Sequence, residues 1–131
     1  MSSKEYLLDT HTWLWWLFEP ERLSKTALDL MQKPENRLTL SVASIWEIGI
    51  KVARGKLKLP SRPMDFIPEV LAQFRFTTIE IQAIHALEAA ALPPHHADPF
   101  DRLLIAQSHL ERIPLVSADL KLDSYGVKRI W

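Results

Sequence analysis

The sequence of 131 residues has no cysteine, only three glycines and no excess of either charge. Without cysteine the chain can form neither a disulfide nor a thiolate-ligated metal site, and a reducing compartment fits this composition. Three glycines are too few for the glycine-rich loops of P-loop and dinucleotide-binding folds. Because sixteen basic residues balance sixteen acidic ones, any nucleic acid must be held by a local basic patch rather than by overall charge.

The chain also lacks a long hydrophobic run. The apolar stretch that begins at Tyr6 is interrupted by Asp9, far short of the length that spans a membrane. We therefore expect a soluble, cytoplasmic protein with no membrane partner. The length is that of one ordinary domain, and no repeat or low-complexity tract divides it, so residues 1–131 are predicted to form a single domain.

Short apolar segments alternate with helical patterns along the whole chain. Such alternation predicts an α/β fold, a three-layer α/β/α domain with a mostly parallel central sheet. The segments with strand character are 6–8, 38–42, 74–79, 115–116 and 127–131, and those with helical character are 12–18, 23–31, 44–53, 64–73, 80–92 and a helix that begins near 99 and stops before Pro114.

Four acidic residues occupy comparable places in this pattern. Asp9 and Asp119 each follow a short apolar strand, and Glu47 and Asp101 stand in the expected first turns of two helices. In an open α/β sheet, ligands bind at the carboxyl ends of the strands, so the four carboxylates are expected to converge there. Like charges at such short distances need a counter-charge. A set of oxygen ligands that includes no cysteine favours Mg²⁺ or Mn²⁺ as that counter-charge. Such ions can activate water and stabilise the leaving oxygen of a phosphodiester.

Each acid also has a purely structural interpretation. Asp9 can serve as the N-cap of the helix after it, and Ser44 with Glu47 three residues later forms a capping-box pattern. Asp98 followed by Pro99 is typical of an N-cap with proline at the first helical position, so Asp98 is predicted to be structural first.

Histidines give a weaker signal than the acids. No pair has the spacing of a zinc motif, and we predict that His95 and His96 belong to a loop rather than to a metal site. An aspartyl-phosphate hydrolase would also begin with a strand and an Asp, but it would carry a second Asp where this chain has His11.

Two further segments suggest contacts with partners. The segment from 51 to 62 contains no acid, and it can hold phosphates or simply be a solvated loop. The helix at 12–18 is apolar on more than one face, so its outer face is either covered by neighbouring helices or open to an apolar partner helix or a second copy of the chain. The RNA-backbone candidates are Lys51, Arg54, Lys56 and Lys58, and the partner-groove candidates are Trp13, Trp16 and Leu17.

Taken together, the stretches LLDTHTWLWW, SIWEIGIK, DPFDRLLIAQ and PLVSAD resemble a PIN domain, and specifically the VapC-like toxins of type II toxin–antitoxin systems. The resemblance covers nearly the whole chain. It implies a metal-dependent endoribonuclease with an RNA substrate and a small antitoxin protein as partner. The alternative is a PIN-like module that binds RNA or protein without cleaving, but such a module has no physical need for four uncompensated carboxylates.

Carried over to this chain, the resemblance assigns the metal and catalytic positions by the motifs that surround them. Many relatives carry one more acid two residues after the last Asp, where this chain has Lys121 and reaches its next acid only at Asp123. The implied metal ligands and catalytic residues are Asp9, Glu47, Asp101 and Asp119, and the implied supporting residues are Thr10, Asp98 and Ser117.

Overall fold

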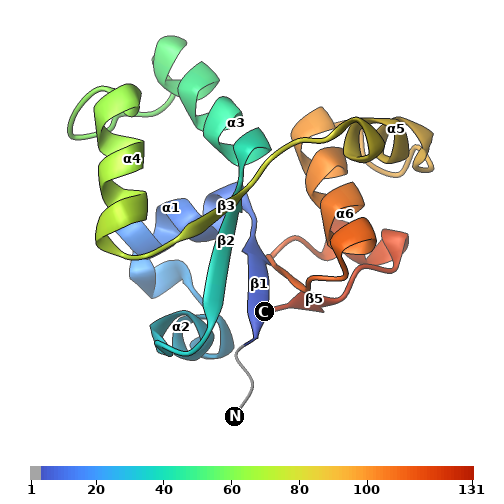
Figure 1. Cartoon of the computed structure of the whole chain (residues 1–131), viewed down its shortest axis with the longest axis horizontal. Helices are drawn as coiled ribbons and strands as arrows, with labels where there is room; N and C mark the ends of the chain where they lie inside the picture. The colour runs from blue at the N-terminus through green and yellow to red at the C-terminus, as the bar shows by residue number, and fades with distance from the viewer. Residues whose placement is uncertain (1–3) are drawn as a thin grey trace.

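The computed structural model describes residues 4–131 as a central sheet with helices on both of its faces (Figure 1). The helices are α1 Thr10–Phe18, α2 Lys25–Gln32, α3 Val42–Ala53, α4 Pro63–Gln73, α5 Ala83–Ala91 and α6 Pro99–Glu111, with short 3₁₀ helices η1 Pro20–Arg22 and η2 Leu120–Tyr125. The strands are β1 Glu5–Leu8, β2 Arg37–Ser41, β3 Thr77–Ile79, β4 Leu115–Val116 and β5 Arg129–Ile130.

The sheet has the strand order β3-β2-β1-β4-β5, and every neighbouring pair is parallel. The predicted three-layer α/β/α architecture is therefore confirmed. Strand β1 lies at the centre, so its residues from Tyr6 to Leu8 are buried and apolar on both faces of the sheet, and only Glu5 at its start is partly exposed. Because all strands run the same way, their carboxyl ends share one edge of the sheet, and Asp9 stands at the middle of that edge.

Side chains of β1 alternate between two hydrophobic cores. Tyr6 and Leu8 face the core formed with α1, α2, α3 and α4, whereas Leu7 faces the core formed with α6 and η2. Figure 1 shows these two groups of helices on opposite sides of the sheet, with α5 packed outside α6.

Helix α3 begins earlier than its sequence suggests. Its N-cap is Ser41, whose hydroxyl accepts from the Ala43 N–H at 3.0 Å, so the predicted capping box at Ser44 is wrong. Strand β2 passes directly into the helix without an intervening loop. Glu47 consequently lies in the second turn of α3 rather than in the first.

Other boundaries shift for similar reasons. Strand β3 starts at Thr77 because α4 and its cap extend to Phe74, and α5 spans three residues fewer at its start than the predicted segment 80–92. Asp98 caps α6 as the sequence predicts, and Ser24 caps α2 by accepting from the Ala27 N–H at 3.0 Å.

The aromatic helix α1 corrects one partner-groove candidate. Trp13 is completely buried, with its ring 6.1 Å from that of Phe76, so it belongs to the core and offers no surface to a partner. Trp16 and Leu17 remain partly exposed. An apolar helix has no polar face to mark its outer side, so only the packing on the sheet separates these roles.

No helix in the described part of the chain, residues 4–131, combines the length and the apolar character needed to cross a membrane.

Candidate active site

Two of the four predicted acids follow strands at the carboxyl edge of the sheet. Asp9 comes after β1 and caps α1, accepting from the Thr12 N–H at 2.7 Å, and only 8% of the residue is exposed. Asp119 comes after β4 and caps η2, accepting from the Lys121 N–H at 3.0 Å. Each carboxylate thus has a structural role as well, and the second oxygen of each is not used by the cap.

The Glu47 carboxylate is held on both sides. The Thr10 hydroxyl donates to its Oε1 at 2.7 Å and lies 2.9 Å from the Ser44 hydroxyl, while the Lys51 ammonium lies 3.0 Å from Oε2. Glu47 is only 7% exposed, so this partial neutralisation offsets the desolvation of its charge. Thr10 therefore positions Glu47 against the start of α1.

Asp98 and Asp101 differ in role although they are one turn apart. Asp98 is the N-cap of α6, and its Oδ1 accepts from the N–H groups of Phe100 at 2.9 Å and Asp101 at 3.4 Å. The carboxyl of Asp101 instead faces the ring of His96. Burial, reinforced by the charge of Asp98, raises the pKa of Asp101 to about 7, while the charge of His96 opposes the rise and those of Asp9 and Glu47 add to it.

This electrostatic coupling shows that acids from different elements meet at one place. Asp9 after β1, Glu47 on α3 and Asp98 all act on the carboxyl of Asp101. The charges of Asp9 and Glu47 are thus close enough to raise the pKa of Asp101, and Asp119 is connected to Asp101 through a residue that the sequence predicts to lie in a loop.

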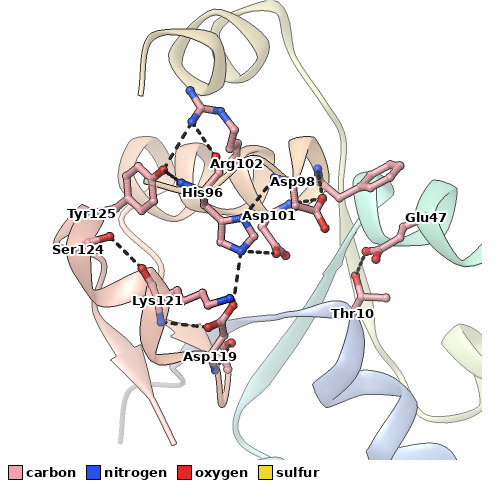
Figure 2. A network of polar contacts seen from close by, with 12 residues as sticks. Thr10, Glu47, His96, Asp98, Asp101, Arg102, Asp119, Lys121, Ser124 and Tyr125 are labelled. Carbon is pink, nitrogen blue, oxygen red and sulfur yellow. Dashed lines mark hydrogen bonds and ion pairs between the residues drawn. The ribbon is translucent and has the colours of Figure 1, made fainter. Parts of the chain in front are cut away.

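That residue is His96, whose ring lies between two of the acids (Figure 2). Its Nε2 is 3.1 Å from Oδ2 of Asp101 and 3.5 Å from Oδ2 of Asp119. Its Nδ1 accepts from the Asp98 N–H at 3.2 Å, so a neutral ring carries its proton on Nε2 and donates it to the carboxylates. The predicted loop position is correct, but no pattern in the sequence indicates that this loop turns into the acidic group.

The loop is held by two side chains from elsewhere in the chain. The Arg102 guanidinium donates to the carbonyls of Leu92 at 2.7 Å, Pro93 at 3.0 Å and His96 at 3.1 Å. The Tyr125 hydroxyl accepts from the His96 N–H at 2.7 Å and donates to the Pro93 carbonyl at 2.8 Å. Figure 2 shows both side chains on the side of the loop away from Asp119.

Ser117 supports Asp119 through the backbone. Its hydroxyl is fully buried and accepts from the Asp119 N–H at 3.1 Å, which fixes the turn after β4. Asp123, the next acid along the chain, pairs with Arg129 at 2.8 Å and stays outside the group. That ion pair lowers the pKa of Asp123, mainly through its hydrogen bond with Arg129.

The donor set fits a divalent cation. One oxygen each of Asp101 and Asp119 and a ring nitrogen of His96 all lie within 4.8 Å of one another, so the two carboxylates are close enough to share one ion. Burial, and after it the charges of neighbouring acids, raise the pKa of Asp101 by disfavouring its ionised form, and a bound cation would offset that cost. Carboxylate oxygens dominate the site, so its chemistry suits Mg²⁺ or Mn²⁺ better than a thiophilic metal.

A pocket of about 400 Å³ opens beside this group, between α3 and the start of α6. Lys51, Arg54 and Lys56 line it, together with Glu47 and Asp98. Lys58, the fourth predicted RNA contact, is exposed but does not line the pocket. Three of the four predicted RNA contacts therefore lie beside the acidic group.

Comparison with known proteins gives consistent relatives. A sequence profile of the PIN domain matches residues 6–128. The chain is 29% identical over 120 residues to ribonuclease VapC22 of Mycobacterium tuberculosis, an alignment that covers 91% of this chain and 90% of the relative.

Solved structures share the fold at low sequence identity. The crystal structure of VapBC2 from Rickettsia felis, bound to a DNA fragment from its promoter, matches with a TM-score of 0.71 and 14% identity over 96% of this chain and 97% of the other. FitAcB from Neisseria gonorrhoeae matches with a TM-score of 0.63 and 16% identity over 96% of each chain.

Proposed function

The chain belongs to the PIN domain family, and from this premise we propose that it is a metal-dependent endoribonuclease and the toxin of a toxin–antitoxin pair. It is a homologue of VapC ribonucleases, and its structural neighbours are proteins of the VapBC and FitAB toxin–antitoxin systems. These relatives support hydrolysis of RNA and an antitoxin partner. The metal dependence and the residue roles rest on the site itself.

The observation that carries the proposal is the gathering of acids from separate elements around Asp101. Its carboxyl lies 3.1 Å from a histidine nitrogen that also approaches Asp119, and its pKa lies at about 7 because burial and three neighbouring acids disfavour its charge. Such a perturbed group in a cluster of like charges is typical of a functional site. A domain that only binds a partner gains nothing from this repulsion.

The proposed ligands are Asp9, Glu47, Asp101 and Asp119. A divalent cation held by them would activate water and stabilise the leaving oxygen of the phosphodiester. The chain's own residues position these groups: Thr10 and Lys51 orient Glu47, and the Nε2–H of His96 orients Asp101 and Asp119. Asp98 fixes the start of α6 and thereby the direction in which Asp101 points.

The direct test is cleavage of a 5′-labelled RNA by the purified protein with Mg²⁺ or Mn²⁺, compared with the same reaction in EDTA. We expect cleavage only with the metal, and a matched single-stranded DNA should remain intact. Absence of cleavage with any RNA tested, while the protein still binds RNA or its partner, would support the non-catalytic module instead.

Metal binding should also stabilise the fold. Because the acids converge only in the native state, an ion bound there raises the free energy of unfolding, by about 2.7 kcal/mol at one hundred times its dissociation constant. We expect millimolar Mn²⁺ or Mg²⁺ to raise the melting temperature measured by differential scanning fluorimetry. A folded protein whose melting temperature is the same in EDTA and in both metals would count strongly against the site.

The antitoxin is proposed to contact the outer face of α1. Trp16 and Leu17 are partly exposed there, with the Trp16 ring 4.9 Å from that of Phe74. Phe18, 42% exposed, stacks on Phe66 and extends the same apolar surface. An amphipathic helix of a partner would bury this surface, as aromatic residues commonly do in interfaces.

Leu17→Arg tests this contact by placing a charge on that surface. We expect it to weaken binding of the cognate antitoxin at least ~10-fold, because a buried unpaired charge is strongly unfavourable, while RNA cleavage by the free protein persists. Leu87→Arg on α5, at a residue 67% exposed, is the matched control and should change neither property. A solved complex whose contacts avoid residues 12–31 would exclude the proposed surface.

A further inference from the structure

Among the Phe, Trp and Tyr residues of the described part of the chain, the most exposed one lies next to the acidic group. Trp46 is 59% exposed although it directly precedes Glu47, a residue that is 7% exposed. Its ring meets that of Phe100 edge to face, with the centroids 5.3 Å apart and the planes at 80°. Phe100 in turn directly precedes Asp101. The pair therefore bridges α3 and α6 at the point where each helix contributes one acid to the site.

Positive charge adjoins this aromatic pair. Phe100 lines the 400 Å³ pocket that also contains Arg54 and Lys56. Within residues 4–131, neither of these cations forms an ion pair, whereas Lys51 is paired with Glu47 at 3.0 Å. Two exposed, uncompensated cations and an open indole thus flank the proposed cleavage site on one side.

The protein itself does not need this arrangement. An exposed Trp forgoes the free energy that its burial would give, and the contact with Phe100 leaves more than half of Trp46 open to solvent. A neighbouring pair of cations repels in the absence of an anion. Both features are accounted for by one ligand that carries flat apolar rings and phosphates.

Single-stranded RNA is such a ligand. Bases stack on aromatic side chains with little sequence preference, and cations beside them follow the phosphates. A second copy of the chain fits less well, because a twofold contact centred on Trp46 would bring the two basic segments together. An apolar partner helix would leave Arg54 and Lys56 without counter-charges.

We propose that Trp46 and the adjoining pocket between α3 and α6 form a nucleotide subsite of the RNA substrate. In this subsite the exposed ring of Trp46, supported edge to face by Phe100, stacks on a base beside the scissile phosphate, while Arg54 and Lys56 bind the adjoining backbone phosphates. The proposal rests on the proposed function and adds to it a means of selecting single strands. In a duplex the faces of the bases are covered by their neighbours, so the aromatic pair can act only on unpaired RNA.

The test measures RNA affinity separately from cleavage. Full-length Asp101→Asn protein serves as a non-cleaving background, and the probe is a fluorescein-labelled 12-nucleotide RNA of mixed sequence, followed by anisotropy at several salt concentrations. We expect Trp46→Ala to raise the dissociation constant about 5- to 150-fold, the effect of losing one stacked base. Trp46→Phe should restore most of the affinity, because a smaller ring still stacks.

The charges have a distinct signature. Arg54→Ala with Lys56→Ala should reduce the dependence of log affinity on log salt by about 0.7 for each phosphate that is no longer neutralised, whereas Trp46→Ala should leave that slope unchanged. Phe18→Ala is the aromatic control, at a residue 42% exposed on α1, and Lys33→Ala with Arg37→Ala removes one Lys and one Arg near the opposite edge of the sheet. Both controls should bind the RNA as the background protein does.

Three outcomes would overturn the inference. If Trp46→Ala binds the 12-nucleotide RNA with unchanged affinity while the wild-type enzyme cleaves RNA, the subsite is wrong and the proposed function stands. If Trp46→Ala converts a dimer into a monomer in light scattering without a change in RNA affinity, the surface joins two copies of the chain. If Trp46→Ala weakens the binding of an RNA duplex as much as that of the single strand, base stacking does not explain the contribution of Trp46 to affinity. Failure of the wild-type protein to cleave any RNA would instead reject the proposed function.

Discussion

Asp101→Asn is expected to reduce RNA cleavage about 100-fold or more while leaving the fold intact. The substitution keeps the size of the side chain but removes a negative charge from the proposed cation ligands, and the loss of one such electrostatic group commonly has an effect of this size. Melting temperatures with and without Mn²⁺ provide a second readout, because the variant should gain less stability from the metal than the wild type does.

The same substitution should change how stability depends on pH. Burial, with the charge of Asp98 as the next cause, raises the pKa of Asp101 from 3.8 to about 7 in the folded protein. Between those two values the native state binds more protons than the unfolded state, so the stability of the metal-free protein falls as the pH rises. Above pH 7 the carboxylate is ionised in both states, and the native state then bears the full cost of its burial and of the neighbouring charges.

Metal-free Asp101→Asn should therefore be more stable than the wild type at pH 8, and the difference should shrink as the pH falls toward 4. Urea denaturation in EDTA at several pH values measures this difference. A wild-type protein whose metal-free stability follows the same pH profile as the variant would show that Asp101 is not held near its neighbours.

Asp98→Asn is the matched control, since it removes the same charge one turn away. Asn caps a helix about as well as Asp, so stability and most of the activity should persist, while Asp98→Ala should cost about 0.5–2 kcal/mol. If Asp98→Asn were inactive and Asp101→Asn active, Asp98 would be the proposed metal ligand and Asp101 the structural residue.

Arg102→Ala is expected to have the largest effect on stability. The guanidinium donates to the carbonyls of Leu92, Pro93 and His96, and its Nε donates to that of Ala89 at 3.1 Å. Its removal takes a donor from the carbonyls of Ala89, Leu92 and His96, whereas the Pro93 carbonyl still accepts from Tyr125, and the expected loss of stability is about 3 kcal/mol. Arg102→Lys should restore little, because an ammonium cannot reproduce the planar fork.

The loop that carries His96 should open in this variant. Hydrogen exchange at the His96 amide, which donates to Tyr125 at 2.7 Å, reports the opening, and RNA cleavage should fall with it because the start of α6 loses its support. Arg112→Lys is the control, at an exposed residue that caps the other end of α6, and should be neutral. Equal stability of Arg102→Ala and the wild type in urea would show that the loop is held by other contacts.

The parts of the fold that follow from neighbouring residues could be predicted from the sequence. Asp9 after β1 and Asp119 after β4 mark the ligand edge, because a short apolar run that ends in an acid is a local pattern. Asp98 before Pro99 defines a helix start in the same way. The alternation of strands and helices then predicts the three layers. The resemblance to a PIN domain was also recognisable from the sequence, and the family match over residues 6–128 agrees with it.

Tertiary structure decided whatever depends on residues that are distant in the chain. Ser41 and Ser44 are equally good caps, and α3 starts at the first because β2 must end where it pairs with β1 and β3. Trp13 is buried and Trp16 is not, since a helix apolar all round has no sequence signal for the face that meets the sheet.

The site divides along the same line. Local patterns and a resemblance predict Asp9, Glu47, Asp101 and Asp119 as site residues. They do not predict the raised pKa of Asp101, which arises from burial and from acids on other elements. The position of His96 between two acids could not be predicted from the sequence either, because the loop around it has no regular hydrogen bonding of its own. Only when Arg102 from α6 and Tyr125 from η2 bind its backbone does that loop bring the imidazole to Asp101 and Asp119.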